Sequence, residues 1–247
     1  CIDKPNQKMT QEIEIKVASN FKTLSNGLLT RSIQNADGTR SDVWTMNQPH
    51  APYLAMMTIG NFEVIRDYWN GKELSYYVEP EYKPYARAIF GKTPAMMEFF
   101  STRLGVPYAW PKYAQIVARD YVSGAMENTS ATLHGEFLQK TSRQLLDENN
   151  EDIISHELFH QWFGDLVTCE SWSNIPLNES FATYGEYLWN EFDHGKQFAD
   201  WRQHRSVQGY FSEAKNKKTA DLIRFYYDDR EDMFDAHSYN KGGAILH

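Results

Sequence analysis

One short motif constrains this chain more than any other. His156, Glu157 and His160 form the pattern H-E-x-x-H, and Glu179 follows His160 after eighteen intervening residues. Side chains four positions apart share one face of an α-helix, so the two imidazoles can point at one spot. That arrangement is typical of a zinc ion bound by a helix, with the glutamate between the histidines placed to handle a proton. The alternative is a pair of ordinary histidines on a helix face.

The ligand set predicts a particular chemistry. Two imidazoles, from His156 and His160, and the Glu179 carboxylate leave the fourth zinc position for a water molecule, as in catalytic sites. Zinc makes such a water more acidic and polarises a carbonyl oxygen. Glu157 lies one residue round the helix from His156, so we expect it to act as the general base rather than as a ligand.

Other residues of the same region are candidates for supporting roles. Phe159, Trp162 and Phe163 suit a helix buried against a core. Thr183 and Glu186 follow Glu179 by one and two helical turns, where they could orient a zinc-bound imidazole. Ordinary helix-face positions are the alternative for both.

Composition excludes several classes of protein. The chain has 247 residues, of which 41% are hydrophobic and 15% aromatic, as expected for a folded protein. The net charge is −8 and no basic stripe is present, which argues against a nucleic-acid partner. No apolar run reaches the roughly 18 residues of a membrane-spanning helix. The two cysteines, Cys1 and Cys169, indicate no disulfide framework.

The first third of the chain reads as β-structure. Ile13, Ile15 and Val17 alternate with polar residues, as in a strand with one buried face. Residues 35–38 form a turn sequence, and the Asn-Gly pair at residues 70–71 is a strong hairpin signal. We therefore predict an all-β part over residues 1–72 and a mixed part over residues 73–247.

Helical signals dominate the second part. Thr93 and Pro94 predict a helix start, and Gly105 predicts its end. Residues 113–118 read as a strand, and a helix is expected from about residue 178 to about residue 192. The remainder, from residue 195 to the end, is expected to be mostly helical, with a break at the charged segment 227–232.

A second candidate site precedes the histidine motif by about thirty residues. It follows the predicted strand and consists of Gly124, Ala125, Met126, Glu127 and Asn128. Taken alone, such a glycine-containing segment could be a simple turn.

The two motifs together resemble a known family. H-E-L-F-H-Q-W-F-G-D followed by W-x-x-x-P-L-N-E-S-F-A-T-Y is similar to the aminopeptidase N family of gluzincin zinc metallopeptidases, and the similarity covers essentially the whole chain. It implies an α+β fold, in which the end of an N-terminal β domain is followed by a thermolysin-like catalytic domain. The opening C-I-D-K-P resembles a segment late in the family's β domain, so Cys1 is expected to be internal to a longer parent. Lys4 departs from the acidic residue usual there. The resemblance further implies that the family's helical C-terminal domain is expected to lie outside these 247 residues.

The resemblance also implies roles for individual residues. The segment from Gly124 to Asn128 matches the family's G-x-M-E-N motif, whose glutamate binds the free α-amino group of the substrate, here Glu127. S-Y-N-K-G is similar to the family's Tyr-Glu-Lys-Gly segment, whose tyrosine stabilises the oxyanion of the tetrahedral intermediate, here Tyr239. Asn240 replaces the usual acidic residue.

The sequence thus predicts a zinc-dependent aminopeptidase that hydrolyses the N-terminal peptide bond of peptides with a free N-terminus. One zinc ion per chain is expected, with its bound water as the nucleophile. Two alternatives stay open. Some relatives are non-catalytic interaction modules of the same fold, and others hydrolyse an epoxide. The sequence indicates neither the preferred N-terminal residue, nor the compartment, nor the oligomeric state.

Overall fold

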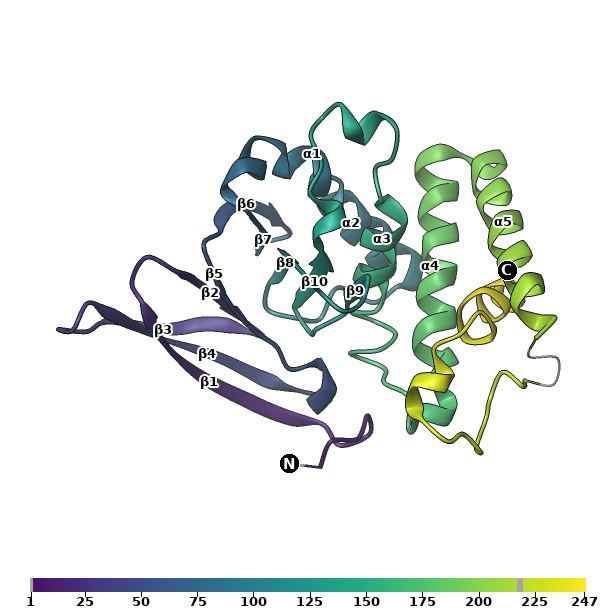
Figure 1. Cartoon of the computed structure of the whole chain (residues 1–247), viewed down its shortest axis with the longest axis horizontal. Coiled ribbons are helices and arrows are strands. Elements are labelled where there is room, and N and C mark those ends of the chain that lie inside the picture. The colour runs from purple at the N-terminus through teal and green to yellow at the C-terminus, as the bar shows by residue number, and fades with distance from the viewer. Residues whose placement is uncertain (1, 217–219) are drawn as a thin grey trace. The chain divides into compact units, whose positions relative to one another are not determined.

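The computed structural model describes residues 2–216 and 220–247, in two compact units (Figure 1). The first unit holds residues up to Asp3 and Gln7–Asn150, and the second holds Lys4–Asn6 and Glu151–His247. The chain is α+β, as predicted. Cys1, which was expected to be internal to a longer parent, lies outside the described residues. No helix within the described residues is both long and apolar enough to cross a membrane.

The described part of the first unit contains ten strands and two α-helices. The strands are β1 (Met9–Ala18), β2 (Lys22–Ser25), β3 (Leu28–Gln34), β4 (Thr39–His50), β5 (Met57–Gly60), β6 (Glu63–Trp69), β7 (Lys72–Val78), β8 (Tyr113–Ala118), β9 (Ala125–Met126) and β10 (Ala131–Gly135). The helices are α1 (Ala86–Phe90) and α2 (Thr93–Leu104).

The N-terminal strands form a three-stranded sheet in the order β1-β4-β3, beside a β2-β5 pair (Figure 1). In β1 the side chains of Gln11 and Ile15 are buried and those of Ile13 and Val17 are partly buried, while the residues between them are exposed. This alternation confirms the predicted strand. The turn at residues 35–38 joins β3 to β4, with Gly38 in a left-handed conformation at φ 81°.

The remaining strands form a five-stranded sheet in the order β6-β7-β8-β10-β9. Asn70 and Gly71 have φ of 46° and 77° and close the β6-β7 hairpin, which confirms the hairpin prediction. Strand β8 runs parallel to both β7 and β10, whereas β9 is antiparallel to β10. The short strand β9 is therefore an edge of the sheet. The boundary proposed between residues 72 and 73 falls inside β7, after its first residue, and stays a prediction.

Helix α2 covers the residues expected of it, with a small difference at its start. Gly105 ends it in a left-handed conformation, as predicted. The N-cap position is Lys92, and Thr93 is the first helical residue. The Thr93 hydroxyl donates back to the Phe90 carbonyl at 2.7 Å, so it does not cap the N–H groups of its own helix.

One buried histidine of this unit makes stability depend on pH. Neither ring nitrogen of His134 in β10 has a hydrogen-bond partner among the described residues, and its ring lies 5.7 Å from that of Phe90. Burial lowers the pKa of His134 to about 3, from an ordinary value of 6.5. Below pH 6.5 the His134 imidazole therefore binds a proton in the unfolded chain but stays neutral in the folded chain. The stabilisation is complete above pH 6.5 and is lost as the pH falls towards 3.

We expect His134→Leu to flatten this dependence. Each pH unit in that window is worth up to roughly 1.4 kcal/mol, so the free energy of unfolding of the variant should fall about 2 kcal/mol less than that of the parent between pH 6.5 and 5. Urea unfolding with a chelator present measures this without a contribution from metal loss. His204→Leu, at an exposed position of the second unit, is the control. Identical pH profiles for parent and His134→Leu would refute the assignment.

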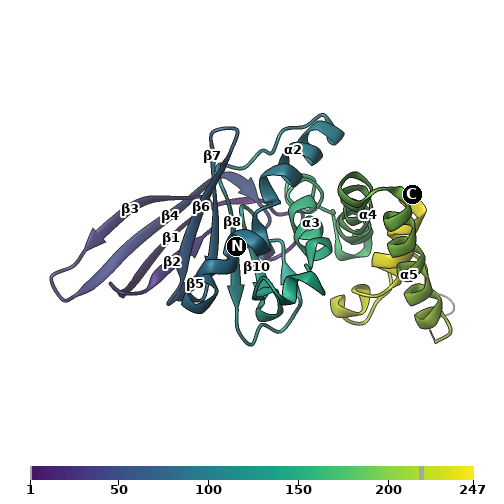
Figure 2. The same cartoon turned by 90° about the horizontal axis from the view of Figure 1, so that it is seen from above.

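The second unit is helical. Its α-helices are α3 (Glu151–Phe159), α4 (Pro176–His194), α5 (Lys196–Ala214) and α6 (Gly242–Leu246). Helix α4 packs against both α3 and α5 (Figure 2). Gly185 makes the approach to α3 possible, since a Cβ atom there would lie 2.6 Å from the ring of Phe159. The helix predicted at about 178–192 is confirmed and is longer by two residues at each end.

The segment after α5 corrects the sequence reading. It is irregular from residue 220 to residue 229, so the break begins seven residues before the predicted segment 227–232. A short 3₁₀ helix, η6 (Arg230–Met233), then overlaps the end of that predicted break. The Asp229 side chain accepts from the N–H of Glu231, and Asp232 bonds back to the N–H of Asp229. Asp229 and Asp232 therefore cap a short helix inside the charged segment. A single π-helical turn, η7 (His237–Lys241), leads into α6.

Candidate active site

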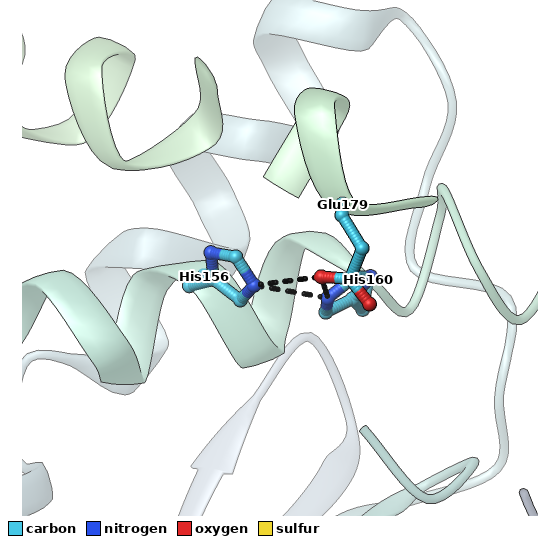
Figure 3. A group of neighbouring side chains, drawn as sticks. All are labelled: His156, His160 and Glu179. Carbon is cyan, nitrogen blue, oxygen red and sulfur yellow. Dashed lines mark hydrogen bonds and ion pairs between the residues drawn. The ribbon is translucent and has the colours of Figure 1, made fainter. Parts of the chain in front are cut away.

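The histidine motif lies at the C-terminal end of α3. His160 directly follows the last residue of this helix, and its N–H still donates to the His156 carbonyl at 3.1 Å. Both imidazoles therefore stay on one face. Figure 3 shows the two rings directed towards one another and Glu179 reaching the same place from the first turn of α4. All three side chains are buried.

Three ligand atoms meet at this place. The Nε2 atoms of His156 and His160 are 3.1 Å apart, and Glu179 Oε2 lies 3.4 Å from the first and 3.3 Å from the second. Tetrahedral ligands at zinc distances of about 2.0–2.1 Å are separated by roughly 3.3 Å. The three atoms therefore match one face of a zinc tetrahedron, which leaves the fourth position to another ligand.

The hydrogen bonds behind the rings fix their protonation. His156 Nδ1 lies 2.6 Å from Glu186 Oε1, and His160 Nδ1 lies 2.9 Å from the Phe163 carbonyl oxygen. Both oxygens are acceptors, so each neutral ring carries its proton on Nδ1. In these neutral tautomers the two Nε2 lone pairs face each other across 3.1 Å, and a cation between them, either a proton or a metal ion, removes their repulsion. The donor set therefore fits a bound metal ion.

The charges around the site favour a cation as well. Burial alone would lower the pKa of His156, but the Glu179 and Glu186 carboxylates outweigh burial and raise this pKa well above its ordinary value. Burial would raise the pKa of Glu179, yet the neighbouring imidazoles of His160 and His156 hold it well below its usual range. These charges therefore favour a cation beside an ionised Glu179 carboxylate.

Of the two supporting residues considered from sequence, the structure brings only one to the imidazoles. Glu186 makes the contact with His156 described above. The Thr183 hydroxyl is buried and has no hydrogen-bond partner among the described residues. Both lie on α4 after Glu179, but Thr183 lies next to Gly243 of α6, whereas the longer Glu186 side chain reaches the His156 ring.

Glu157 and Tyr239 complete the cluster in this unit. Glu157 is buried on α3, and its charge contributes to the raised pKa of His156. Tyr239 lies in η7, and its ring stacks on that of His156, with centroids 5.9 Å apart and planes inclined by 10°. The structure therefore brings residues separated by more than eighty positions to one imidazole. Asn240, which departs from the family pattern, donates to the carbonyl and hydroxyl of Ser206 on α5.

Gly124, Ala125, Met126, Glu127 and Asn128 belong to the first unit. Ala125 and Met126 form edge strand β9, and the Gly124 carbonyl accepts from the N–H of Gly135 at 2.9 Å. The Asn128 side chain donates to the Leu54 carbonyl at 3.2 Å. The segment is thus an edge strand held by the sheet rather than a simple turn. The role of these residues towards a substrate stays a prediction.

Sequence reasoning missed three residues that surround η7. Arg224 and Asp235 form a largely buried ion pair, and Glu213 of α5 bonds the His237 ring. Asp235 stands four positions before Tyr239, a local signal for a helix cap, but nothing in the sequence indicates its partners.

Comparison with known proteins identifies relatives of this chain. The family model described as "Peptidase family M1 domain" matches residues 89–247. Over the full length of this chain, glutamyl aminopeptidase of Sus scrofa is 29% identical, endoplasmic reticulum aminopeptidase 1 of Mus musculus 29%, and aminopeptidase M1-A of Oryza sativa subsp. japonica 28%. The chain spans 27%, 27% and 29% of these proteins, about a quarter of their length. With more than half of its residues matched by the family model, the chain belongs to peptidase family M1.

Proposed function

We propose that this chain carries the active site of a zinc-dependent aminopeptidase. The observation that supports this most is the triangle of His156 Nε2, His160 Nε2 and Glu179 Oε2, with both rings held in the tautomer that binds metal. The similar proteins are named aminopeptidases. In this proposal residues 73–247 belong to a thermolysin-like catalytic domain and residues 1–72 to the end of a β domain.

His156, His160 and Glu179 would hold one zinc ion. When bound, zinc polarises the carbonyl of the scissile peptide bond and makes a water molecule more acidic. Glu157 accepts the proton of the attacking water and passes it to the leaving nitrogen. Its place on α3 between the two histidines keeps its carboxylate beside the ligands without sharing their face.

Tyr239 is assigned as the donor to the developing oxyanion. Its phenol hydroxyl would bond the carbonyl oxygen more strongly as negative charge builds up there. Such a bond stabilises the transition state more than the bound substrate and so lowers the barrier. The stack of its ring on His156 supports this role, because it fixes the phenol next to a metal-ligand candidate.

Glu127 is assigned to bind the free α-amino group of the substrate. A carboxylate paired with an ammonium group fixes where the peptide starts relative to the reacting carbonyl. The edge strand formed by Ala125 and Met126 supports the assignment, since an extended peptide can pair with the exposed backbone of such an edge. Together, Gly124 to Asn128 would select peptides with a free N-terminus.

Blocked peptides test this proposal directly. We expect a short peptide with a free N-terminus to be hydrolysed at its first peptide bond, and its N-acetylated form to show a kcat/KM lower by on the order of 10²- to 10³-fold, because the charged pair is lost. Liquid chromatography of the products measures both rates. Glu127→Gln should slow cleavage of the free peptide by a similar factor, whereas Glu136→Gln, at an exposed position nine residues away, should not. Equal cleavage of both peptides would overturn the assignment of Glu127.

A further inference from the structure

The turn that carries Tyr239 is capped by two carboxylates. The N–H groups of His237 and Ser238 donate to Asp235 Oδ1 at 3.1 and 3.0 Å. The N–H of Ala236 donates to both oxygens of Glu213, at 3.2 and 3.1 Å. The N–H of Tyr239 itself donates to the Asp235 carbonyl at 3.1 Å. The backbone donors at the start of η7 are therefore all bonded, chiefly by Asp235.

Arg224 in turn fixes Asp235. Its Nη1 and Nη2 atoms donate to the two carboxylate oxygens of Asp235 at 2.7 and 2.9 Å, and Nη2 also donates to the Ser238 hydroxyl at 3.0 Å. The side chains are only 14% and 3% exposed. A planar guanidinium is the only side chain with this paired geometry, so a lysine cannot reproduce it. Arg224 thus bonds both the capping residue and η7.

This cluster is not a second metal site. Glu213, Asp235 and His237 bring potential ligand atoms within reach of one another. The guanidinium of Arg224, however, already supplies the cation for Asp235, and Glu213 is engaged by the Ala236 N–H and the His237 ring. The cluster is better explained as a support for η7.

A second set of contacts joins η7 to the helix of the Glu179 carboxylate. Ser180, the next residue along α4, donates its hydroxyl to the Ser238 carbonyl at 2.6 Å. A Cβ atom on Gly242 would lie 1.8 Å from the Ser180 Oγ, so the approach of this segment to α4 requires a glycine. The position of Tyr239 is therefore defined from both sides of η7.

We propose that Arg224 is a positioning residue for Tyr239. Through Asp235 and Ser238 it sets the backbone of η7, and thereby holds the Tyr239 ring on His156. This inference rests on the proposed function, because it assigns Arg224 to the same hydrolytic step. It places Arg224 outside the chemistry itself, since among the described residues the guanidinium donates only to Asp235, to the Ser238 hydroxyl and to the backbone carbonyls of Asp232 and Met233.

A double-mutant cycle tests the proposal. We expect Arg224→Met to lower kcat by on the order of 10- to 100-fold, since small displacements of a positioned group have effects of that size. KM and zinc content should change little. In a Tyr239→Phe background, which itself lowers kcat, the same substitution should lower kcat less than about twofold further. Arg224→Lys, which keeps the charge and loses the paired geometry, should resemble Arg224→Met. Arg230→Met, at an exposed arginine six residues away, is the matched control.

A merely structural role predicts a different pattern. If Arg224 only stabilised the fold, its loss would lower kcat equally in both backgrounds, and that result would overturn the proposal. Should Arg224→Met fail to fold, Ser238→Ala takes its place in the cycle, since it removes one acceptor of Arg224 together with the hydroxyl's own hydrogen bond to the Met233 carbonyl. A crystal structure of the variant gives a readout independent of activity, because the Tyr239 ring should leave its stack on His156. If the parent protein is inactive but the Tyr239 ring still shifts in the Arg224→Met variant, the proposed function is refuted. The positioning role of Arg224 then stands.

Discussion

Glu157→Gln is expected to lower kcat by about 10²- to 10⁴-fold while the bound zinc is retained, the range associated with loss of a general base. Glutamine has nearly the shape of glutamate, so the buried position on α3 stays filled. It cannot accept the proton of the attacking water at neutral pH. The effect should therefore appear in kcat rather than in KM or in metal content.

The measurement combines steady-state hydrolysis of a free peptide with elemental analysis of the same preparation. Glu170→Gln, an exposed glutamate of the same unit, removes an equal charge away from the motif and should leave kcat unchanged. A Glu157→Gln protein that keeps near-parental kcat would remove Glu157 from the mechanism. Loss of zinc together with activity would instead assign Glu157 to the metal ligands.

The features that sequence predicted well are those fixed by neighbours in the chain. Alternation of Ile13, Ile15 and Val17 determines which face of β1 is buried, and Asn70-Gly71 can adopt the left-handed dihedrals of a tight hairpin without help from elsewhere. The H-E-x-x-H spacing places two imidazoles on one helix face for the same local reason.

The features that sequence did not predict depend on contacts between distant segments. The choice of Glu186 over Thr183 as the partner of His156 follows from how α3 and α6 pack against α4. The capping of η7 requires Arg224, which follows an irregular stretch with no periodic pattern, to reach Asp235. The family resemblance assigned Tyr239 a role, but only the folded unit shows its ring stacked on His156.

His160→Ala is expected to abolish stoichiometric zinc binding. Removing one of three protein ligands removes roughly a third of a binding free energy of about 10–16 kcal/mol, so the affinity should fall by some three or more orders of magnitude. Elemental analysis after dialysis should find about one zinc per parent chain, as proposed, and almost none in the variant. Zinc retained at parental affinity would show that His160 is not a ligand.

Two substitutions on α4 make this test quantitative. Glu186→Gln keeps an acceptor for the His156 Nδ1 proton but removes the charge, and should weaken zinc binding by only about 10- to 100-fold, as is usual for a residue that orients a ligand. Thr183→Val removes a hydroxyl that has no hydrogen-bond partner among the described residues, and should leave the affinity unchanged. Competition with a chelator of known affinity measures the zinc affinity of all three variants, His160→Ala, Glu186→Gln and Thr183→Val. The expected loss of zinc affinity therefore decreases in the order His160, Glu186, Thr183. His160 contacts the metal directly, whereas Glu186 acts only through its hydrogen bond to the His156 ring. The Thr183 hydroxyl contacts neither ring and should have no effect.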